Sequence, residues 1–186
     1  RCGSCVAFAA VAAVEAQFNI ANAAKGYNVD LSEQHLFSRI GRCASGSYVS
    51  AAMSALRWGG IVDEACYQYQ SGRLAVDYPS SGACGQATSS ALRIEGYQTV
   101  NASGLKRALL SGPAVTTFTV YEAFLYYRGG VYQHTSGRSV GGHAVLVVGY
   151  DDTLGAWIVK NSWGHGCCEA GFFKIRYNDV SGLGRS

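Results

Sequence analysis

The stretch that decides the fold is RCGSCVAFAAVAAVEAQF, residues 1–18, in which two cysteines three positions apart lead into an apolar run. Residues 4–24 are apolar on nearly every side, and this pattern predicts a helix that lies inside the protein. The first turn of a helix carries about half a positive charge and free N–H groups, which stabilise a thiolate. Cys5 would occupy that turn, so the sequence raises the question of a nucleophilic sulfur.

The composition is that of a globular chain. Its 186 residues are 48% hydrophobic, enough to bury the core of one domain or of two small lobes. The longest uninterrupted apolar run, from Cys5 to Val14, has ten residues, about half of the ~20 that a membrane-spanning helix needs. Charged residues make up 15%, the net charge is +3 and no Lys/Arg cluster follows one face. We therefore expect neither nucleic acid nor a membrane as a partner.

The first half of the chain is mainly helical in pattern. Helices are expected over residues 4–24, 31–37, 47–58 and 103–110. In DLSEQHLF, Asp30 is the candidate N-cap, and Glu33 follows three residues later as in a capping box. Residues 60–91 are rich in turn formers and contain Cys66 and Cys84, which predicts a long loop held by those cysteines.

The second half changes to a strand pattern. Five strands are expected, over residues 114–120, 130–134, 143–150, 156–161 and 172–177. Helices followed by strands, instead of alternating with them, indicate an α+β protein. The change falls near residue 95, which predicts a helical lobe over residues 1–95 and a β lobe over residues 96–186.

Seven cysteines, an odd number, leave at least one sulfur outside any internal pairing. They stand at positions 2, 5, 43, 66, 84, 167 and 168. Three chemistries fit Cys2 and Cys5: a thiol redox pair, half of a zinc site, or one structural and one nucleophilic cysteine. A fourth interpretation is that both are small apolar residues of the core. The cysteines alone do not decide among these.

A thiolate nucleophile needs an imidazole that exchanges protons with it, and the ring needs an acceptor that orients it. Three histidines fit an ordinary solvated or hydrogen-bonded role: His35, His134 and His165. His143 differs, because it follows two glycines and opens the apolar strand AVLVVGY. Eighteen residues later the apolar strand in WIVKNSWG ends on Asn161, with Trp163 just beyond. Cys5, His143 and Asn161 therefore form a complete set of nucleophile, base and orienting group.

Four segments of the chain occur in the same order in the papain-like cysteine proteases. They are CGSCVAFA, LSEQHLF, GGHAVLVVGY and WIVKNSWG, at residues 2–9, 31–37, 141–150 and 157–164. The resemblance runs from residue 1 to about residue 177, and the 138 positions from Cys5 to His143 agree with the family's spacing. We therefore expect a trimmed or divergent member of that family.

The resemblance implies a two-lobe fold with an active-site cleft between the lobes. A helical lobe with a central helix would carry Cys5, and a lobe made of an antiparallel β-sheet or barrel would carry His143 and Asn161. The implied function is that of a cysteine endopeptidase, a hydrolase that cleaves peptide bonds through an acyl-enzyme. In that mechanism Cys5 is the nucleophile, His143 is the general acid and base, and Asn161 orients the His143 ring. No cofactor and no metal is expected.

The resemblance also implies which residues bind substrate or form disulfides. Gly46 corresponds to a turn glycine whose backbone pairs with extended substrate, and Gly142 and Trp163 are expected to border the site, with Trp163 as a shield against water. Two disulfides are implied, Cys2 with Cys43 and Cys66 with Cys84. They indicate an oxidising compartment, so we expect a secreted, periplasmic, or lysosome- or vacuole-like location, with any signal or pro-segment outside this chain. The expected partners of this monomer are protein or peptide substrates and a pro-segment or protein inhibitor.

The sequence departs from the family pattern at three places. Val6 stands where an aromatic residue usually follows the nucleophile. The family's oxyanion-hole glutamine belongs upstream of the printed sequence. Cys167 and Cys168 stand where the family usually has Trp-Gly. A vicinal disulfide, two free thiols and, with His165, a metal site all remain open for this pair.

Two other functions also remain open on the sequence alone. One is a peptide-binding protein of the same fold with weak or lost peptidase activity, motivated by Val6 and the glutamine. The other is a thiol oxidoreductase that uses Cys2 and Cys5, which leaves His143 and Asn161 without a role. The partner of Cys2 discriminates, because a bond to Cys43 with Cys5 free argues against the oxidoreductase.

Overall fold

The computed structural model describes residues 2–184, apart from the side chain at position 88. The chain divides into two compact units, the first ending at Gln98 and the second beginning at Thr99. Helices dominate the first unit, and the second contains a five-stranded sheet. This composition confirms the predicted α+β class.

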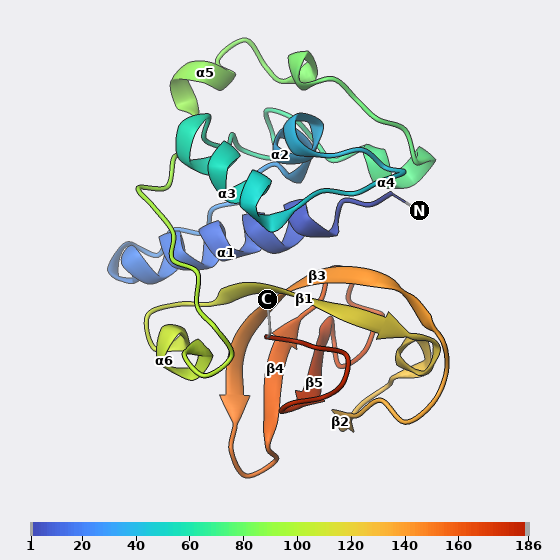
Figure 1. Ribbon diagram of the computed structural model, residues 1–186. Helices are drawn as coiled ribbons and strands as arrows, with labels where there is room; N and C mark the ends of the chain where they lie inside the picture. Colours follow the sequence, from blue (N-terminus) through green and yellow to red (C-terminus); the bar gives the residue numbers. More distant parts are fainter. Residues whose placement is uncertain (1, 185–186) are drawn as a thin grey trace. The chain divides into compact units, whose positions relative to one another are not determined.

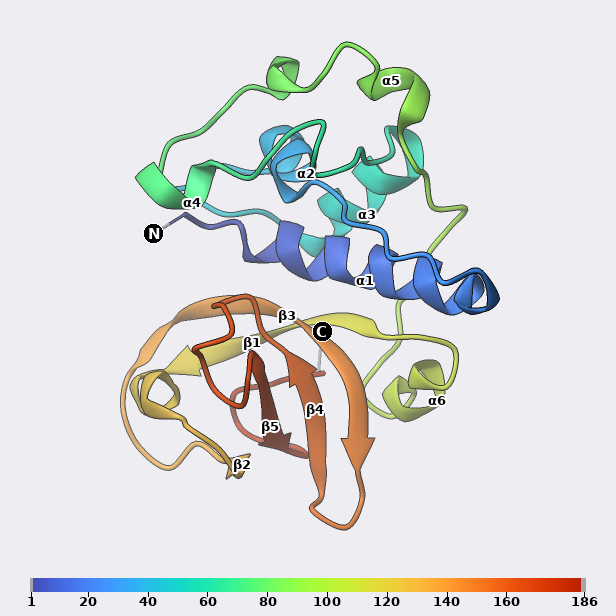
Figure 2. The ribbon, with the colours of Figure 1, turned by 180° about the vertical axis from the view of Figure 1, so that it is seen from behind.

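Three helices form the centre of the first unit and lie side by side in Figures 1 and 2: α1 (Cys5–Ala21), α2 (Glu33–Ile40) and α3 (Val49–Trp58). The buried residues of α1 are Val6, Ala7, Ala9, Ala10, Val11 and Val14. Its last turns reach solvent, where the Ile20 side chain is 55% exposed. The predicted buried helix is therefore an interior element in its N-terminal half, the half that carries Cys5.

The α2 helix starts after Ser32, two residues later than the capping-box pattern predicts. Ser32 is the N-cap, and its hydroxyl oxygen accepts a hydrogen bond from the His35 N–H at 2.9 Å. The Ser32 N–H donates to the carbonyl of Val62 at 2.8 Å, which keeps the chain extended at this point. The prediction of Asp30 as the N-cap is therefore wrong.

The segment after α3 contains short helices where the sequence predicts a loop. They are α4 (Ser71–Leu74), η2 (Ser80–Gly82) and α5 (Ala87–Ser90), in addition to η1 (Ala23–Lys25) after α1. A disulfide joins Cys66 to Cys84 across this segment. The cysteines hold it as the sequence suggests, and local turns supply the helical geometry between them.

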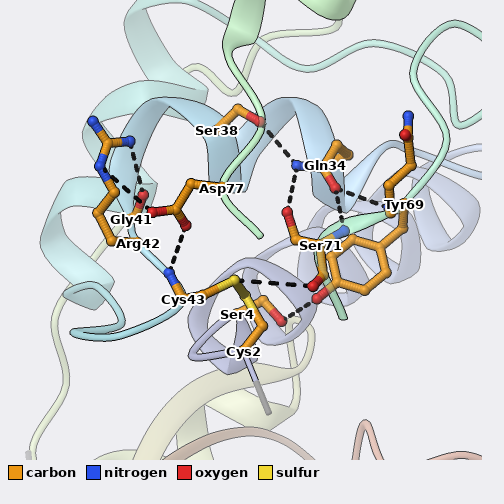
Figure 3. The surroundings of a disulfide bond; sticks show 11 residues. Cys2, Ser4, Gln34, Ser38, Gly41, Arg42, Cys43, Tyr69, Ser71 and Asp77 are labelled. Atoms are coloured by element: carbon orange, nitrogen blue, oxygen red, sulfur yellow. Dashed lines mark hydrogen bonds and ion pairs between the residues drawn. A yellow bond between two sulfur atoms is a disulfide. The ribbon is translucent and has the colours of Figure 1, made fainter. Parts of the chain in front are cut away.

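Gln34 on α2 connects that segment to the helical core. Its side chain is fully buried. The side-chain oxygen accepts from the N–H groups of Gln70 and Ser71 at 2.9 and 3.0 Å. The amide nitrogen donates to the hydroxyls of Ser38 and Ser71 at 2.9 and 3.0 Å (Figure 3). All four hydrogen-bonding positions of this buried amide are satisfied, which a buried polar group requires.

The second unit is a sheet with short helical segments beside it (Figure 1). The helix α6 (Leu105–Leu109) precedes the strands β1 (Ala114–Tyr121), β2 (Val131–Tyr132), β3 (Ser139–Asp151), β4 (Ala156–Lys160) and β5 (Phe172–Arg176), and η3 (Glu122–Tyr126) follows β1. The strand order is β1-β3-β4-β5-β2. Aromatic rings fill its core: Phe124 packs edge-on against Phe118 and Phe173, with ring centroids 5.3 and 4.8 Å away.

The expectation of an antiparallel sheet needs one correction. The pairs β1–β3, β3–β4 and β4–β5 are antiparallel, but β2 pairs with β5 in parallel. The chain leaves β1 through η3 and reaches the far edge of the sheet, so β2 does not form a hairpin with β1. The sheet is therefore mixed, although the parallel part is only two residues long.

Burial gives two neighbouring side chains of α2 opposite shifts in proton affinity. Burial raises the pKa of Glu33 from 4.5 to about 7. Burial, together with the positive charge of Arg39, lowers the pKa of His35 from 6.5 to about 4. Both groups therefore favour their neutral forms in the folded protein.

These two shifts predict opposite pH dependences of stability. Folded Glu33 keeps its proton from pH 4.5 to about 7 while the unfolded group loses it, so its contribution to stability falls as pH rises through that range. Unfolded His35 gains a proton below pH 6.5 that the folded ring accepts only near pH 4, so its contribution falls as pH drops. Across its own pH range, each group's contribution to the free energy of unfolding changes by about 1 to 2 kcal/mol once solvent screening is included. Urea unfolding of Glu33→Gln and His35→Gln from pH 4.5 to 7 should show opposite slopes, with the unmodified protein between them. Parallel slopes in the two variants would contradict the assignment.

Candidate active site

Cys5 is the first residue of α1 and carries a free thiol. The turn before it is fixed by Ser4, whose hydroxyl lies 2.6 Å from the hydroxyl of Tyr69. Phe8, one turn into the helix, packs edge-on against the same tyrosine ring with centroids 4.8 Å apart. The unpaired N–H groups and the positive end of the helix dipole therefore meet at Cys5.

A disulfide between Cys2 and Cys43 ties a loop to the start of α1 (Figure 3). The Gly3 N–H donates to the Cys43 carbonyl at 2.9 Å. Gly3 and Gly46 touch so closely that a Cβ on Gly3 would lie 2.8 Å from the Gly46 Cα. Gly46 has φ of +70°, a left-handed conformation that glycine adopts without strain. Glycine is required at both positions, and Gly46 lies beside the residues that lead into Cys5.

Asp77 supports the same loop from the other side. Its carboxylate accepts from the Cys43 N–H at 2.7 Å and pairs with Arg42 at 3.9 Å (Figure 3). Because Cys2 is bonded to Cys43, Cys5 has no disulfide partner at the neighbouring cysteine. This pairing argues against the thiol oxidoreductase and against a zinc site that uses Cys2.

His143 and Asn161 meet in the second unit. His143 lies on β3, and Asn161 follows the end of the adjacent strand β4. His143 Nε2 is 2.8 Å from Asn161 Oδ1, and both side chains are 7% exposed. Asn161 Oδ1 also accepts the Ser162 N–H at 2.8 Å, which identifies this atom as the acceptor oxygen. The proton of the ring therefore lies on Nε2, and Nδ1 is left free to exchange a proton with another group.

Trp163 covers one face of the His143 ring. The two rings stack with centroids 4.9 Å apart, and Trp163 is held edge-on by Phe124 at 5.7 Å. On another side Phe118 contacts the imidazole at 5.9 Å. Burial lowers the pKa of His143, and the hydrogen bond to Asn161 opposes that effect by favouring the charged ring. An aromatic surround therefore keeps water from the His143–Asn161 hydrogen bond. Phe118 and Phe124 were not predicted, because nothing in the local sequence links them to His143.

Gly142 precedes His143 on β3 and is exposed. It pairs with Thr119 of β1, and nothing lies within 4 Å of the position that a Cβ would take. The residues assigned from the sequence thus form two groups. Cys2, Cys5, Cys43 and Gly46 belong to the first unit, and Gly142, His143, Asn161 and Trp163 to the second.

The structure joins Cys167 and Cys168 in a disulfide, a state that the sequence leaves open. The bond removes both thiolates that a metal site with His165 would need. Throughout residues 2–184, no group of three or more His, Cys, Asp or Glu side chains is arranged to hold a metal ion. The same residues contain no helix with the length and hydropathy to span a bilayer.

Comparisons with known proteins agree on one family. A family model described as "Papain family cysteine protease" matches residues 1–185. A relative named "Cathepsin B-like CP3" from Giardia intestinalis is 37% identical over 184 residues, which cover 94% of this chain and 61% of the relative. The bromelain protease from Ananas comosus, solved with the E64 inhibitor, is 30% identical with a TM-score of 0.76, covering 97% of this chain and 82% of that one.

A third comparison concerns the fold alone. A procathepsin B from Trypanosoma congolense superimposes with a TM-score of 0.82 at 23% identity, covering 99% of this chain and 67% of that one. Three curated relatives match 94% of this chain, and the chain spans about three fifths of the length of each of them. The match to these structures agrees with the helical and sheet-bearing units described above.

Proposed function

Since the chain belongs to the papain family of cysteine proteases, we propose that it hydrolyses peptide bonds as an endopeptidase through a Cys5 acyl-enzyme. The observation that carries the proposal is the hydrogen bond of 2.8 Å between His143 Nε2 and Asn161 Oδ1. It fixes the tautomer of the ring and leaves Nδ1 as the nitrogen that can share a proton with a thiol.

The mechanism divides the work among three side chains. The Cys5 thiolate attacks the carbonyl carbon of the peptide, and the oxyanion that forms accepts a hydrogen bond from the Cys5 N–H at the helix start. The His143 imidazolium then gives its Nδ1 proton to the leaving amine. A water molecule, deprotonated by the same ring, attacks the thioester and releases the acid. Asn161 stabilises the ring whenever it is charged, because its oxygen accepts a hydrogen bond from the Nε2–H.

The substrate-binding roles follow from the same residues. We assign Gly46 to backbone pairing with an extended peptide, and Gly142 and Trp163 to the walls beside the reacting bond. The absence of a side chain at Gly142, and the open space around it, give a peptide room next to His143. The proposal requires that the two units bring Cys5 within hydrogen-bonding reach of His143 Nδ1.

The location and partners of the protein form part of the proposal. The disulfides Cys2–Cys43 and Cys66–Cys84 support a secreted, periplasmic or lysosome-like compartment, because such bonds persist in oxidising surroundings. Protein or peptide chains are the proposed substrates. A pro-segment or a protein inhibitor is a further proposed partner, since solved relatives include a proform and an inhibitor complex. We propose that the peptidase acts as a monomer.

Covalent labelling tests the proposed function. A thiol-directed epoxide should modify Cys5 with one equivalent, and turnover of a fluorogenic peptide should fall in proportion to the modified fraction. Mass spectrometry of the peptide that contains Cys5 locates the adduct. Full turnover by protein that carries one adduct on Cys5 would refute the mechanism. A slow reaction of the epoxide with Cys5, without any turnover, would favour the peptide-binding alternative.

A further inference from the structure

The loop that follows β4, residues 162–171, places two sulfurs against the amide of Asn161. Asn161 Nδ2 lies 3.6 Å from Cys167 Sγ and 3.8 Å from Cys168 Sγ, and a disulfide joins the two cysteines. The opposite end of the amide, Oδ1, accepts from His143 Nε2 and from the Ser162 N–H. The sulfurs therefore contact the side of Asn161 that the imidazole does not use.

We propose that the Cys167–Cys168 pair positions the Asn161 amide and that its oxidation state controls how firmly Asn161 holds the His143 ring. The effect on the ring is a property of the second unit alone. The effect on turnover rests on the proposed function.

The reason lies in the hydrogen-bonding character of the sulfurs. In a disulfide both sulfurs can only accept, so they favour the NH₂ group of Asn161 on their side and its oxygen toward His143. A thiol also carries an S–H donor, which can donate to the amide oxygen. Two thiols at this position no longer favour the NH₂ group on their side alone, so only the Ser162 N–H and His143 hold the amide oxygen in place. The oxygen is then a less firmly placed acceptor for the imidazolium N–H, so the ring binds its proton less tightly.

The backbone of the loop is held by contacts that do not involve sulfur. The Cys167 carbonyl accepts from the Gly171 N–H at 2.9 Å, and the Cys167 N–H donates to the Gly164 carbonyl at 3.2 Å. The Asn161 N–H donates to the Gly171 carbonyl at 2.9 Å. The Glu169 carboxylate also accepts from the Gly130 N–H at 3.0 Å. Reduction should therefore change the chemistry of the sulfurs and leave the path of the loop in place.

The loop that carries the two sulfurs reaches solvent. Cys167 and Cys168 are half-buried, and the preceding His165 and Gly166 are exposed. The thiolate of a small dithiol attacks one of the two sulfurs and forms a mixed disulfide, while the other sulfur leaves as a thiolate and takes up a proton. The second thiol of the reagent then displaces the first protein sulfur. In total the protein disulfide gains two electrons and two protons, and the dithiol becomes a cyclic disulfide. Oxidised glutathione, a low-molecular-weight disulfide, supports the reverse reaction.

The direct test measures proton binding by the His143 ring in a Cys5→Ala background, where the nucleophile cannot take part in exchange. NMR of the imidazole nitrogens is recorded across pH, once after treatment with oxidised glutathione and once after a small dithiol. Mass spectrometry confirms that only the Cys167–Cys168 bond has changed. We expect the ring to bind its proton about threefold to tenfold more weakly after reduction, a range whose upper end corresponds to losing one ordinary hydrogen bond. Identical titration of His143 in both states would overturn the proposal, as would failure of the pair to form a disulfide under oxidised glutathione.

A matched control separates this effect from a general response to reductant. Cys168 has φ of +62°, a left-handed conformation that glycine accepts more easily than cysteine, so Cys168→Gly should fold and cannot form the bond. Titration of His143 in Cys168→Gly should be the same with either reagent. A redox-dependent titration that persists in Cys168→Gly would assign the effect to another disulfide and overturn the proposal.

An activity measurement distinguishes failure of this proposal from failure of the proposed function. In protein with Cys5 intact and free in both states, reduction of the pair should lower kcat about threefold to tenfold and leave KM unchanged, because Asn161 touches the ring and not the substrate. Equal kcat in both states with an unchanged His143 titration would refute the positioning role and leave the peptidase standing. A redox-dependent His143 titration in a protein that turns over no peptide would support the positioning role and refute the peptidase.

Discussion

Replacement of Cys5 by Ala is expected to lower kcat/KM for peptide hydrolysis by about 10⁵-fold or more. The methyl group of alanine cannot attack a carbonyl, so no acyl-enzyme forms, and residual activity can come only from substrate binding and the oxyanion site. Stopped assays of a fluorogenic peptide with purified protein measure the loss. Titration with a thiol-directed epoxide should at the same time show that no stoichiometric adduct forms.

Gln17→Ala is the matched control for that experiment. Gln17 is an exposed residue of the same helix, α1, and should retain full kcat/KM. Thermal unfolding of both variants should be close to that of the unmodified protein, because neither change opens a cavity in the core. Hydrolysis by Cys5→Ala at more than a hundredth of the original rate would contradict the proposed nucleophile.

Removal of the Cys2–Cys43 disulfide is expected to give the largest loss of stability. The bond closes a loop with a sequence separation of 41, and chain entropy alone assigns about 4 kcal/mol to such a loop. The double variant Cys2→Ala/Cys43→Ala should therefore unfold at a much lower urea concentration. Since this bond also ties the Gly46 loop to Gly3 and the start of α1, KM for extended peptides should rise as well.

The second disulfide provides the comparison for this prediction. Cys66 and Cys84 are separated by 18 positions, and the same estimate gives about 3 kcal/mol. Cys66→Ala/Cys84→Ala should therefore lose somewhat less stability and leave KM closer to its original value, because this bond is not attached to the start of α1 and its segment supports the Gly46 loop only through Asp77. Equal effects of the two double variants on KM would show that the Cys2–Cys43 bond has no special role at the start of α1.

The predictable parts of the fold are those specified by neighbouring residues. The start of α1 at Cys5 and the strands around His143 and Asn161 follow from local apolar patterns and were expected from the sequence. The N-cap of α2 could not be chosen from the local pattern, because Ser32 replaces Asp30 through a contact with Val62, which is distant in sequence. The parallel pairing of β2 with β5 depends likewise on two segments about forty positions apart.

The site shows the same division. The sequence suggests that His143 opens one apolar strand and that Asn161 ends another, and the antiparallel pairing of β3 with β4 brings them into hydrogen-bonding distance. The sequence did not show that Phe118 and Phe124 would surround the ring and its tryptophan. The sequence also did not show that the Cys167 and Cys168 sulfurs contact the Asn161 amide. That contact depends on how a glycine-rich loop folds back on itself. Tertiary packing decides each of these contacts.

The segment after β5 has a consequence for self-association. The Ser181 carbonyl accepts the Thr119 N–H at 2.8 Å, the Gly184 N–H donates to the Thr116 hydroxyl at 3.1 Å, and Leu183 is buried. The first two contacts are made to β1, one of the two edge strands of the sheet, and the first of them uses a backbone N–H of that strand. An edge strand with free backbone groups is a template to which strands of other chains can pair, which leads to aggregation. The Ser181 carbonyl pairs with one such group of β1, the Thr119 N–H, and so leaves one fewer backbone donor for intermolecular β-pairing.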